Sequence, residues 1–360
     1  MTRAGLLRQH RRPTPDGLSL HPMTAPAPLP NASSPWPHRL AVLLACATFP
    51  LLWVGGLVTT YDAGMAVPDW PTTYGHNPLA YPLRTWLGGP WDIFIEHAHR
   101  LLAGVINVIA VALVVVLWRA EGRPWVRRLG YLAVAGVLVQ DLLGGLRVVL
   151  DERVLAQAHA CVGPAFFALA ALLAAITSSA WGSARGVPHG RCGKVRGLAL
   201  LTALLAYLQI VLGSQVRHMP ADATPSQFRG AVFFHLLGAA LVAGHSIGLC
   251  WRMRRQHAAQ RRLRRGADWL AVLVGVQILL GVGAWLVNYG WPSFVPRPDV
   301  AEGLTVVRGG TGQVLVSTAH VACGSLIVAW AASLAAWTHR LVCQPPAVAA
   351  KATWQWGGAG

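Results

Sequence analysis

The chain has 360 residues, of which 54% are hydrophobic and only 12% are charged, and its mean hydropathy is +0.46. A soluble domain carries about 25% charged residues, so this composition excludes a disordered chain, a secreted disulfide scaffold and an ordinary soluble enzyme. The net charge of +17 would indicate nucleic-acid binding in a soluble protein. In a membrane protein, basic residues instead mark one side of the bilayer.

Eight apolar stretches are long enough to cross a bilayer core, which needs about 20 helical residues. They are rich in Leu, Val and Ala, and none shows the strict alternation that a membrane strand requires. The predicted spans are 40–60, 94–118, 129–147, 154–179, 198–216, 230–250, 269–287 and 314–337. We therefore expect an all-α integral membrane protein with eight transmembrane helices.

The basic residues predict the orientation of these spans. With the N-terminus inside, 22 Lys and Arg residues lie inside and 8 outside, and the connection 251–268 alone holds seven Arg. Acidic residues divide the other way, with 3 inside and 10 outside. The basic excess is therefore a topology signal, the nucleic-acid interpretation loses its support, and both termini are expected to be cytoplasmic.

A short motif recurs in the odd-numbered spans, and each even-numbered span carries one histidine about five or six residues from its outer start. The motif is Gln140-x-x-Leu-Gly144, Gln209-x-x-Leu-Gly213 and Gln277-x-x-Leu-Gly281, with Leu51-x-x-Val-Gly55 in the first span, and the histidines are His99, His159, His235 and His320. This repeat predicts helical hairpins grouped into two pseudo-symmetric four-helix bundles.

The expected organisation follows from this grouping. It comprises a disordered cytoplasmic tail over 1–38, an N-terminal bundle over 39–180, a cytoplasmic linker over 181–197, a C-terminal bundle over 198–340 and a second cytoplasmic tail over 341–360. Met23 is an alternative start to Met1. The six Cys lie outside the predicted outer loops and form no CxxC motif, which argues against a disulfide framework, a zinc finger and covalent c-type haem attachment.

Four histidines at one depth on four helices favour metal ligation. A single buried histidine is at least as often a hydrogen-bonded structural residue, but ionisable residues within spans are usually functional. Two histidines on facing helices can hold one haem iron, and apolar, Gly-rich walls suit a porphyrin better than a bare divalent ion. Cys161 and Cys323 are expected to point away from the rings, and His97 to face another helix or the interface. His218, in an outer loop, could approach the edge of a cofactor, but a solvated loop residue is favoured.

The segment around His99 is the candidate catalytic site. Glu96 lies three residues before His99 on the same helix face, where it can exchange protons with a substrate or act as a helix cap. The corresponding positions before the other three histidines are Ala156, Val232 and Ser317. This asymmetry predicts one reactive site and one electron-transfer site.

Three arginines are candidate cofactor-binding residues. Arg100 can pair with Glu96 or with a haem propionate. Arg147 and Arg217 follow a Gly motif at the outer end of odd-numbered spans, where each can bind a propionate or mark the membrane interface.

These residues resemble the haem A synthase family. The matching elements are Glu96-x-x-His99-Arg100, the segment 67–71 (Val-Pro-Asp-Trp-Pro) after Gly64, the Gln-Leu-Gly-Gly run ending at Arg147, and the histidine of each even span. The resemblance implies eight spans in two similar halves and oxidation of the C8 methyl of haem O to a formyl, which gives haem A for cytochrome oxidase. It further implies that His99 and His159 face the substrate haem and that His235 and His320 hold the iron of a haem b.

The expected setting follows from the same resemblance. The partners are haem O, haem A and the lipid bilayer, with haem O synthase and cytochrome oxidase assembly factors as further candidates and no nucleic acid. We expect a bacterial inner membrane in preference to a mitochondrial inner membrane.

The first outer loop departs from the pattern of the family. Some family members carry a Cys pair in this loop, whereas residues 61–95 contain none here. The loop is expected to cover the site as a lid, with Trp70, Trp86 and Trp91 as lid residues or interfacial anchors.

Two other functions compete with haem A synthesis. A di-haem b cytochrome that transfers electrons, linked to a quinol, fits the four histidines equally well. A transporter needs midplane charges, for which Asp141 is the one strong candidate, and is disfavoured.

Overall fold

The computed structural model describes residues 34–184, 186, 192–293, 295–299 and 305–342. Regular structure within these residues is helical, apart from one isolated bridge between Thr73 and His76. The long helices are α1 (Trp36–Thr60), α3 (Trp91–Ala120), α4 (Pro124–Val149), α5 (Arg153–Thr177), α7 (Cys192–Arg217), α8 (Pro225–Gln256), α9 (Arg261–Tyr289) and α10 (Thr311–Leu341). All eight are long and apolar enough to cross a membrane. The chain is therefore an all-α, multi-pass membrane protein, as predicted.

Seven helices contain the predicted spans and extend beyond them, because helical hydrogen bonding continues past the apolar residues. The exception is α5, which ends at Thr177, two residues before its predicted end. Ser178 is extended there, and its side chain accepts a hydrogen bond from the backbone N–H of Trp181 to cap the short helix α6 (Ser179–Gly182). The new cap stops the longer helix.

Helix starts are marked by proline and by side-chain caps. Proline occupies the first position of α4 and of α8, where its missing N–H has no helical partner to lose. At α8, Thr224 and Gln227 form a reciprocal capping box. These signals set the short connections between neighbouring spans.

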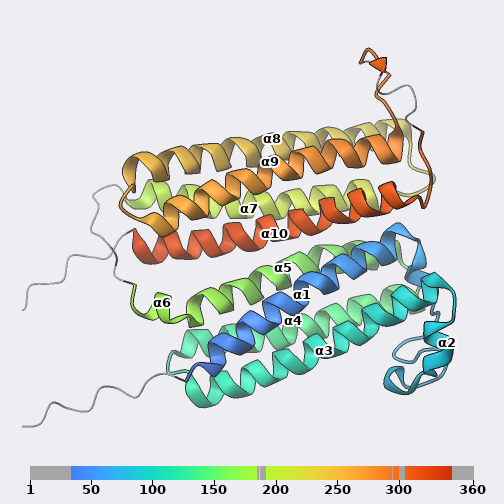
Figure 1. Ribbon diagram of the computed structural model, residues 1–360, viewed down its shortest axis with the longest axis horizontal. Helices are drawn as coiled ribbons and strands as arrows, with labels where there is room; N and C mark the ends of the chain where they lie inside the picture. The colour runs from blue at the N-terminus through green and yellow to red at the C-terminus, as the bar shows by residue number, and fades with distance from the viewer. Residues whose placement is uncertain (1–33, 185, 187–191, 294, 300–304, 343–360) are drawn as a thin grey trace, which may run out of the picture. The chain divides into compact units, whose positions relative to one another are not determined.

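The eight long helices pack as two groups of four, α1–α3–α4–α5 and α7–α8–α9–α10 (Figure 1). Within each group the first helix contacts the second and the fourth, and the third contacts the second and the fourth. The groups meet where α10 lies against α5 and α1. This arrangement is consistent with two pseudo-symmetric bundles.

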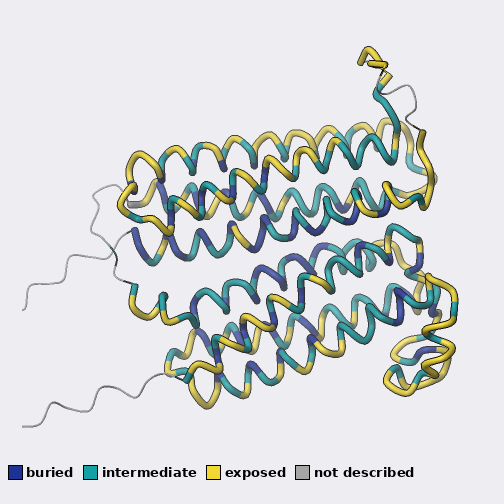
Figure 2. Tube along the Cα trace, viewed as in Figure 1, coloured by how far each residue is buried: buried dark blue, intermediate teal, exposed yellow. Residues whose placement is uncertain are grey.

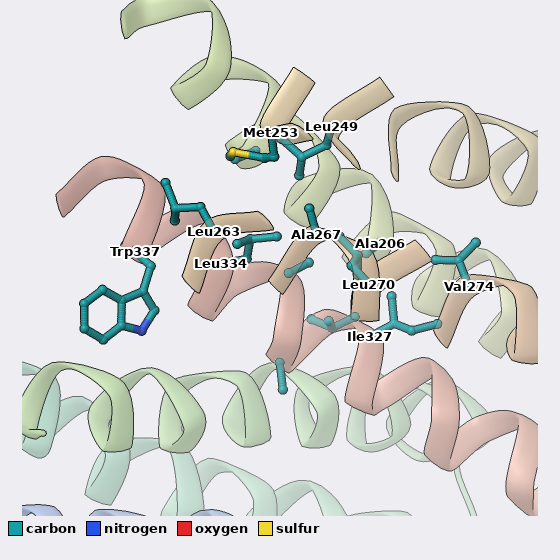
Figure 3. Packing of buried hydrophobic residues seen from close by; sticks show 14 of the residues in the cluster. Ala206, Leu249, Met253, Leu263, Ala267, Leu270, Val274, Ile327, Leu334 and Trp337 are labelled. Carbon is teal, nitrogen blue, oxygen red and sulfur yellow. The ribbon is translucent and has the colours of Figure 1, made fainter. Parts of the chain in front are cut away.

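Each bundle has its own apolar core. In the second, Leu263, Ala267 and Leu270 of α9 pack with α8 and α10 side chains that include Leu249 and Leu334 (Figure 3). The buried positions follow the faces turned toward neighbouring helices, whereas outward faces stay exposed (Figure 2). Exposed Leu and Val on those outer faces are expected where the solvent is lipid.

The long connections lie at the end of the bundles opposite the two described chain ends (Figure 1). We call this the loop end. It carries the first loop, residues 61–90, which holds the 3-10 turns Ala63–Met65 and Pro78–Ala80 and the short helix α2 (Leu83–Leu87).

Parts of the predicted organisation lie outside the described residues, namely 1–33 of the first tail, 185 and 187–191 of the linker, and 343–360 of the second tail. Within the described residues, helix α1 begins at Trp36, inside the predicted tail 1–38. Helix α7 begins at Cys192, inside the predicted linker 181–197.

Candidate functional site

The four predicted histidines form two pairs, one in each bundle. The ring centroids of His99 on α3 and His159 on α5 are 6.3 Å apart, with an interplanar angle of 78°. Those of His235 on α8 and His320 on α10 are also 6.3 Å apart, at 74°. A metal–imidazole bond is about 2 Å long, so two rings on opposite sides of one ion have centroids about 6 Å apart. Both pairs therefore fit a single iron bound between two histidines.

The motif glycines lie directly against these rings. A β-carbon on any of the four would come 3.0–3.1 Å from the Cε1 atom of a histidine ring, closer than ordinary packing allows. The contacts are Gly55 with His99, Gly144 with His159, Gly213 with His235 and Gly281 with His320. The glycine motif and the histidine are thus two parts of one structural unit, in which a glycine on one helix makes room for the histidine on the next long helix.

The hydrogen bond at His159 fits the same role, whereas at His320 the amide nitrogen of Gln277 lies 3.4 Å from Nε2. His159 Nδ1 lies 3.1 Å from the carbonyl oxygen of Gln140, and a histidine that donates from Nδ1 presents Nε2 to a metal. His235 Nδ1 lies 3.0 Å from the amide nitrogen of Gln209. The Nδ1 atoms of His99 and His320 are buried without a hydrogen-bond partner. The thiols of Cys161 and Cys323 contact Ser214 and a backbone carbonyl, away from the rings, as predicted.

Glu96 is buried beside two arginines. Its Oε1 accepts a hydrogen bond from Arg100 Nε at 3.1 Å, its Oε2 lies 3.7 Å from Arg147 Nη2, and Oε2 has no hydrogen-bond partner. The helix-cap alternative is wrong, because α3 begins at Trp91 and Asp92 is the acidic residue in its first turn. Glu96 is therefore an interior carboxylate on the helix face next to His99. Of its two predicted roles, proton exchange and helix capping, only proton exchange is left.

Arg100 pairs with Glu96 and also holds the first loop. Its Nη1 donates to the carbonyl oxygens of Asp69 at 2.7 Å and Thr72 at 2.8 Å, and its Nη2 donates to that of Val67 at 2.9 Å. The guanidinium thus ties the resemblance segment 67–71 to the start of α3.

Asp69 stabilises the turn that follows this segment. Its carboxylate accepts hydrogen bonds from the side chain of Thr72 and from the backbone N–H groups of Tyr74, at 2.7 Å, and Gly75, at 2.8 Å. Partial burial acts to raise the pKa of Asp69, but the hydrogen bonds from Gly75, Thr72 and Tyr74 hold it below its usual value. An ionised Asp69 therefore keeps the turn closed.

His97 differs from its prediction. It is buried under the first loop, where Nδ1 lies 3.2 Å from Thr73 Oγ1 and the ring packs on Tyr81 and Trp86. The expectation that it faces another helix or the membrane interface is wrong. Two positions along a helix turn a side chain by about 200°, which places His97 on the side away from His99 and toward the loop.

The three loop tryptophans pack within the protein to different extents. Trp70 lies over Gly145, where a β-carbon would collide with its ring. Trp86 donates from Nε1 to the carbonyl of Phe94 at 3.2 Å and stacks on that ring. Trp91, the first residue of α3, also stacks on Phe94 but remains half exposed. The first loop therefore covers the loop end of α3 and α4, as a lid would.

A cavity of about 710 Å³ opens in the first bundle, within the range of cofactor sites. His99, His159 and their glycines line it, together with Arg147, and α10 closes one side. The second bundle contributes Arg217, the last residue of α7, which donates to the carbonyl of Gly56 at 3.0 Å and to Thr60 Oγ1 at 2.6 Å. Arginines from both halves therefore line this cavity, together with the acidic residues Asp62, Asp151 and Glu152.

His218 also lines this cavity, so the prediction of a solvated loop residue is wrong. Helix α7 runs to Arg217, and the backbone N–H of His218 still donates to Ser214, which turns the ring inward. Burial, followed by the charges of Arg217 and Arg147, lowers the pKa of His218 to about 4. His218 is thus a neutral cavity residue at pH 7, and only the length of α7 could have indicated it.

The fold and the site define a multi-pass membrane protein with a paired-histidine site in each of two bundles. Residues 90–230 match the family model described as cytochrome oxidase assembly protein. The heme A synthase of Symbiobacterium thermophilum is 29% identical over 260 residues, which cover 64% of this chain and 79% of the relative. The heme A synthase of Exiguobacterium sibiricum is 25% identical over 285 residues, 72% of this chain and 89% of the relative. By these matches the chain is similar to heme A synthases and, over residues 90–230, to the cytochrome oxidase assembly protein family.

Proposed function

We propose that this protein makes haem A by oxidising the C8 methyl of haem O to a formyl group. One observation carries the proposal: the two histidine pairs have the same ring separation, but only the first has a buried carboxylate three residues before a ligand histidine. The names of the relatives support the coarser role in haem A synthesis. The substrate haem belongs in the first bundle.

The resident cofactor in this proposal is a haem b in the second bundle, held by His235 and His320. The 6.3 Å separation of their rings and the glycine contacts at Gly213 and Gly281 fit such a group. A haem held by two histidines supplies one-electron transfer. The protein keeps this site surrounded by the apolar helices α7 to α10.

In the first bundle, His99 and His159 orient the substrate haem. Arg147 and Arg217, at the cavity mouth, bind its propionates, because guanidinium groups form charge-assisted hydrogen bonds with carboxylates. The C8 methyl lies on the same pyrrole ring as one propionate, which brings it toward the Arg147 side, where Glu96 lies. Conversion of the methyl to a formyl takes one oxygen atom from water and releases four electrons and four protons, so it requires an external electron acceptor. Glu96 takes up protons as they are released, and the first loop controls the access of water.

Glu96→Gln tests this assignment, because it keeps the size of the side chain and removes the titratable proton. We expect haem b content to stay near that of the parent while haem A production falls about 10²–10⁴-fold or stalls at the alcohol. Asp92→Asn, in the exposed first turn of α3, is the matched control and should leave both unchanged. Extraction and mass analysis of the haems gives both readouts. Near-parental haem A production by Glu96→Gln would leave the di-haem b cytochrome as the better function.

The proposal places the protein in a bacterial inner membrane, with the loop end outside and both termini in the cytoplasm. The relatives are bacterial, and the Lys and Arg distribution supports this orientation. Haem O synthase would supply the substrate, and cytochrome oxidase assembly factors would receive the product.

A further inference from the structure

Two polar residues of the first bundle break the repeat. Asp141 directly follows the motif glutamine of α4, and Asn107 lies eight residues after His99 on α3. Apolar residues hold the same places in every other repeat: Leu52, Ile210 and Ile278 correspond to Asp141, and Phe167, Ala243 and Val328 correspond to Asn107. Packing therefore does not require polarity at these positions.

The two exceptional residues touch each other. Asn107 Nδ2 donates to Asp141 Oδ2 at 2.6 Å, which joins α3 to α4, and both side chains line the cavity. No ion pair holds the Asp141 carboxylate within the described part of the chain. An ionisable group inside a span is costly and usually functional. The carboxylate of Glu96 has two arginines beside it, whereas the carboxylate of Asp141 has the neutral side chain of Asn107.

The pair lies deeper in the bundle than the arginines. Asp141 precedes Arg147 by six residues on α4, about 9 Å toward the other end of the helix. The cavity wall around it is largely apolar and includes Leu51, Ile106 and Phe166. The cavity thus has arginines at its outer part and a largely apolar interior, where Asp141 is the ionisable lining residue among a few neutral polar ones such as Thr48 and Gln140.

The proposed substrate has the same division. Haem O carries its propionates at one edge and, toward the opposite edge, a long isoprenoid chain with a hydroxyl group next to the ring, where haem b has only a vinyl group. With the propionates at Arg147 and Arg217, the isoprenoid edge faces the interior. An alcohol donates one hydrogen bond and accepts others, and Asp141 with Asn107 offers an acceptor beside a donor.

We propose that Asp141 and Asn107 bind the hydroxyl group of the haem O side chain and so select haem O over haem b in the first bundle. This inference rests on the proposed function. A site built to bind a hydroxyl group strongly rejects the analogue that lacks it, because its polar groups are then left unpaired. The histidine pair alone binds any haem iron, so the selectivity has to come from other cavity residues.

The experiment is a competition between haem O and haem b for the purified full-length protein, followed by extraction and quantification of the haems retained. We expect the parent to favour haem O. Asp141→Ile, which installs the residue of the other repeats, should reduce that preference about tenfold or more. Asp141→Asn keeps the shape and a hydrogen-bonding oxygen and should retain most of it. Ile278→Val, at the same repeat position in α9, is the matched control and should leave it unchanged.

Asn107→Val provides a second route if Asp141→Ile does not fold, and it should also weaken the preference. An unchanged preference in the folded variants, or equal binding of both haems by the parent, would overturn the inference. A parent that selects haem O but does not form haem A would contradict the proposed function and leave the selectivity result intact.

Discussion

The two bundles share a histidine-pair scaffold and differ in what surrounds it. Ring separations, ring angles and glycine contacts are nearly the same in both. Only the first bundle has Glu96 near its pair, the Asp141–Asn107 contact and the covering first loop. The comparison teaches that the repeat builds the histidine–glycine scaffold twice, whereas the unrepeated residues make the two sites different; in the proposed function the scaffold holds a haem and the unrepeated residues decide what happens to it.

The largest expected effect separates the two pairs. His235→Ala or His320→Ala should abolish the low-spin haem b spectrum and lower the thermal stability, because a bound cofactor stabilises the native state. His99→Ala should instead retain haem b and lose haem A production. Optical spectra and haem extraction of the purified variants measure both. An unchanged spectrum in His235→Ala and His320→Ala would remove the haem b assignment.

Arg100→Gln should loosen the first loop while the second bundle stays intact. It removes a buried ion-pair partner of Glu96, a change that destabilises by about 3–5 kcal/mol when the remaining charge is uncompensated. Here Arg147 lies near the same carboxylate, so we expect the lower part of that range. Limited proteolysis should cut residues 61–90 faster than in the parent, with haem b content unchanged. Equal cleavage rates would show that the loop does not depend on Arg100.

Gly213→Val should displace His235, because a β-carbon there comes 3.0 Å from the ring. Such overpacking destabilises by about 1–3 kcal/mol, and haem b should be bound more weakly. Gly197→Val is the control on the same helix, since nothing lies within 4 Å of a β-carbon at Gly197. Gly55→Val should impair only the first bundle. Haem b loss from Gly55→Val and Gly213→Val alike would contradict independent sites.

Reporter fusions test the shared orientation of the bundles and should disturb function least. A fusion after Arg265, in the second turn of α9, should report the cytoplasmic side, and one after Trp91, the first residue of α3, the outer side. The 22-to-8 division of Lys and Arg motivates this expectation. Matching reports from the two positions would refute eight alternating spans.

The sequence by itself determined the number of spans and the repeat, and it predicted the histidines that form the two pairs. Span length depends on the thickness of the bilayer and on local hydropathy, so it can be read from consecutive residues. Glu96 and His99 lie one turn apart on one helix, and their shared face follows from helix geometry alone.

Only the tertiary structure decided which side chains meet across helices. Arg217 reaches α1 over 157 residues to Thr60, and Asn107 meets Asp141 on the next helix, 34 residues away. His97, which from the sequence was expected at a helix contact or the interface, lies under the first loop because Thr73, Tyr81 and Trp86 fold back over it. Such contacts depend on how helices rotate about their axes and how loops return, and these are set by packing over the whole molecule rather than by any local pattern.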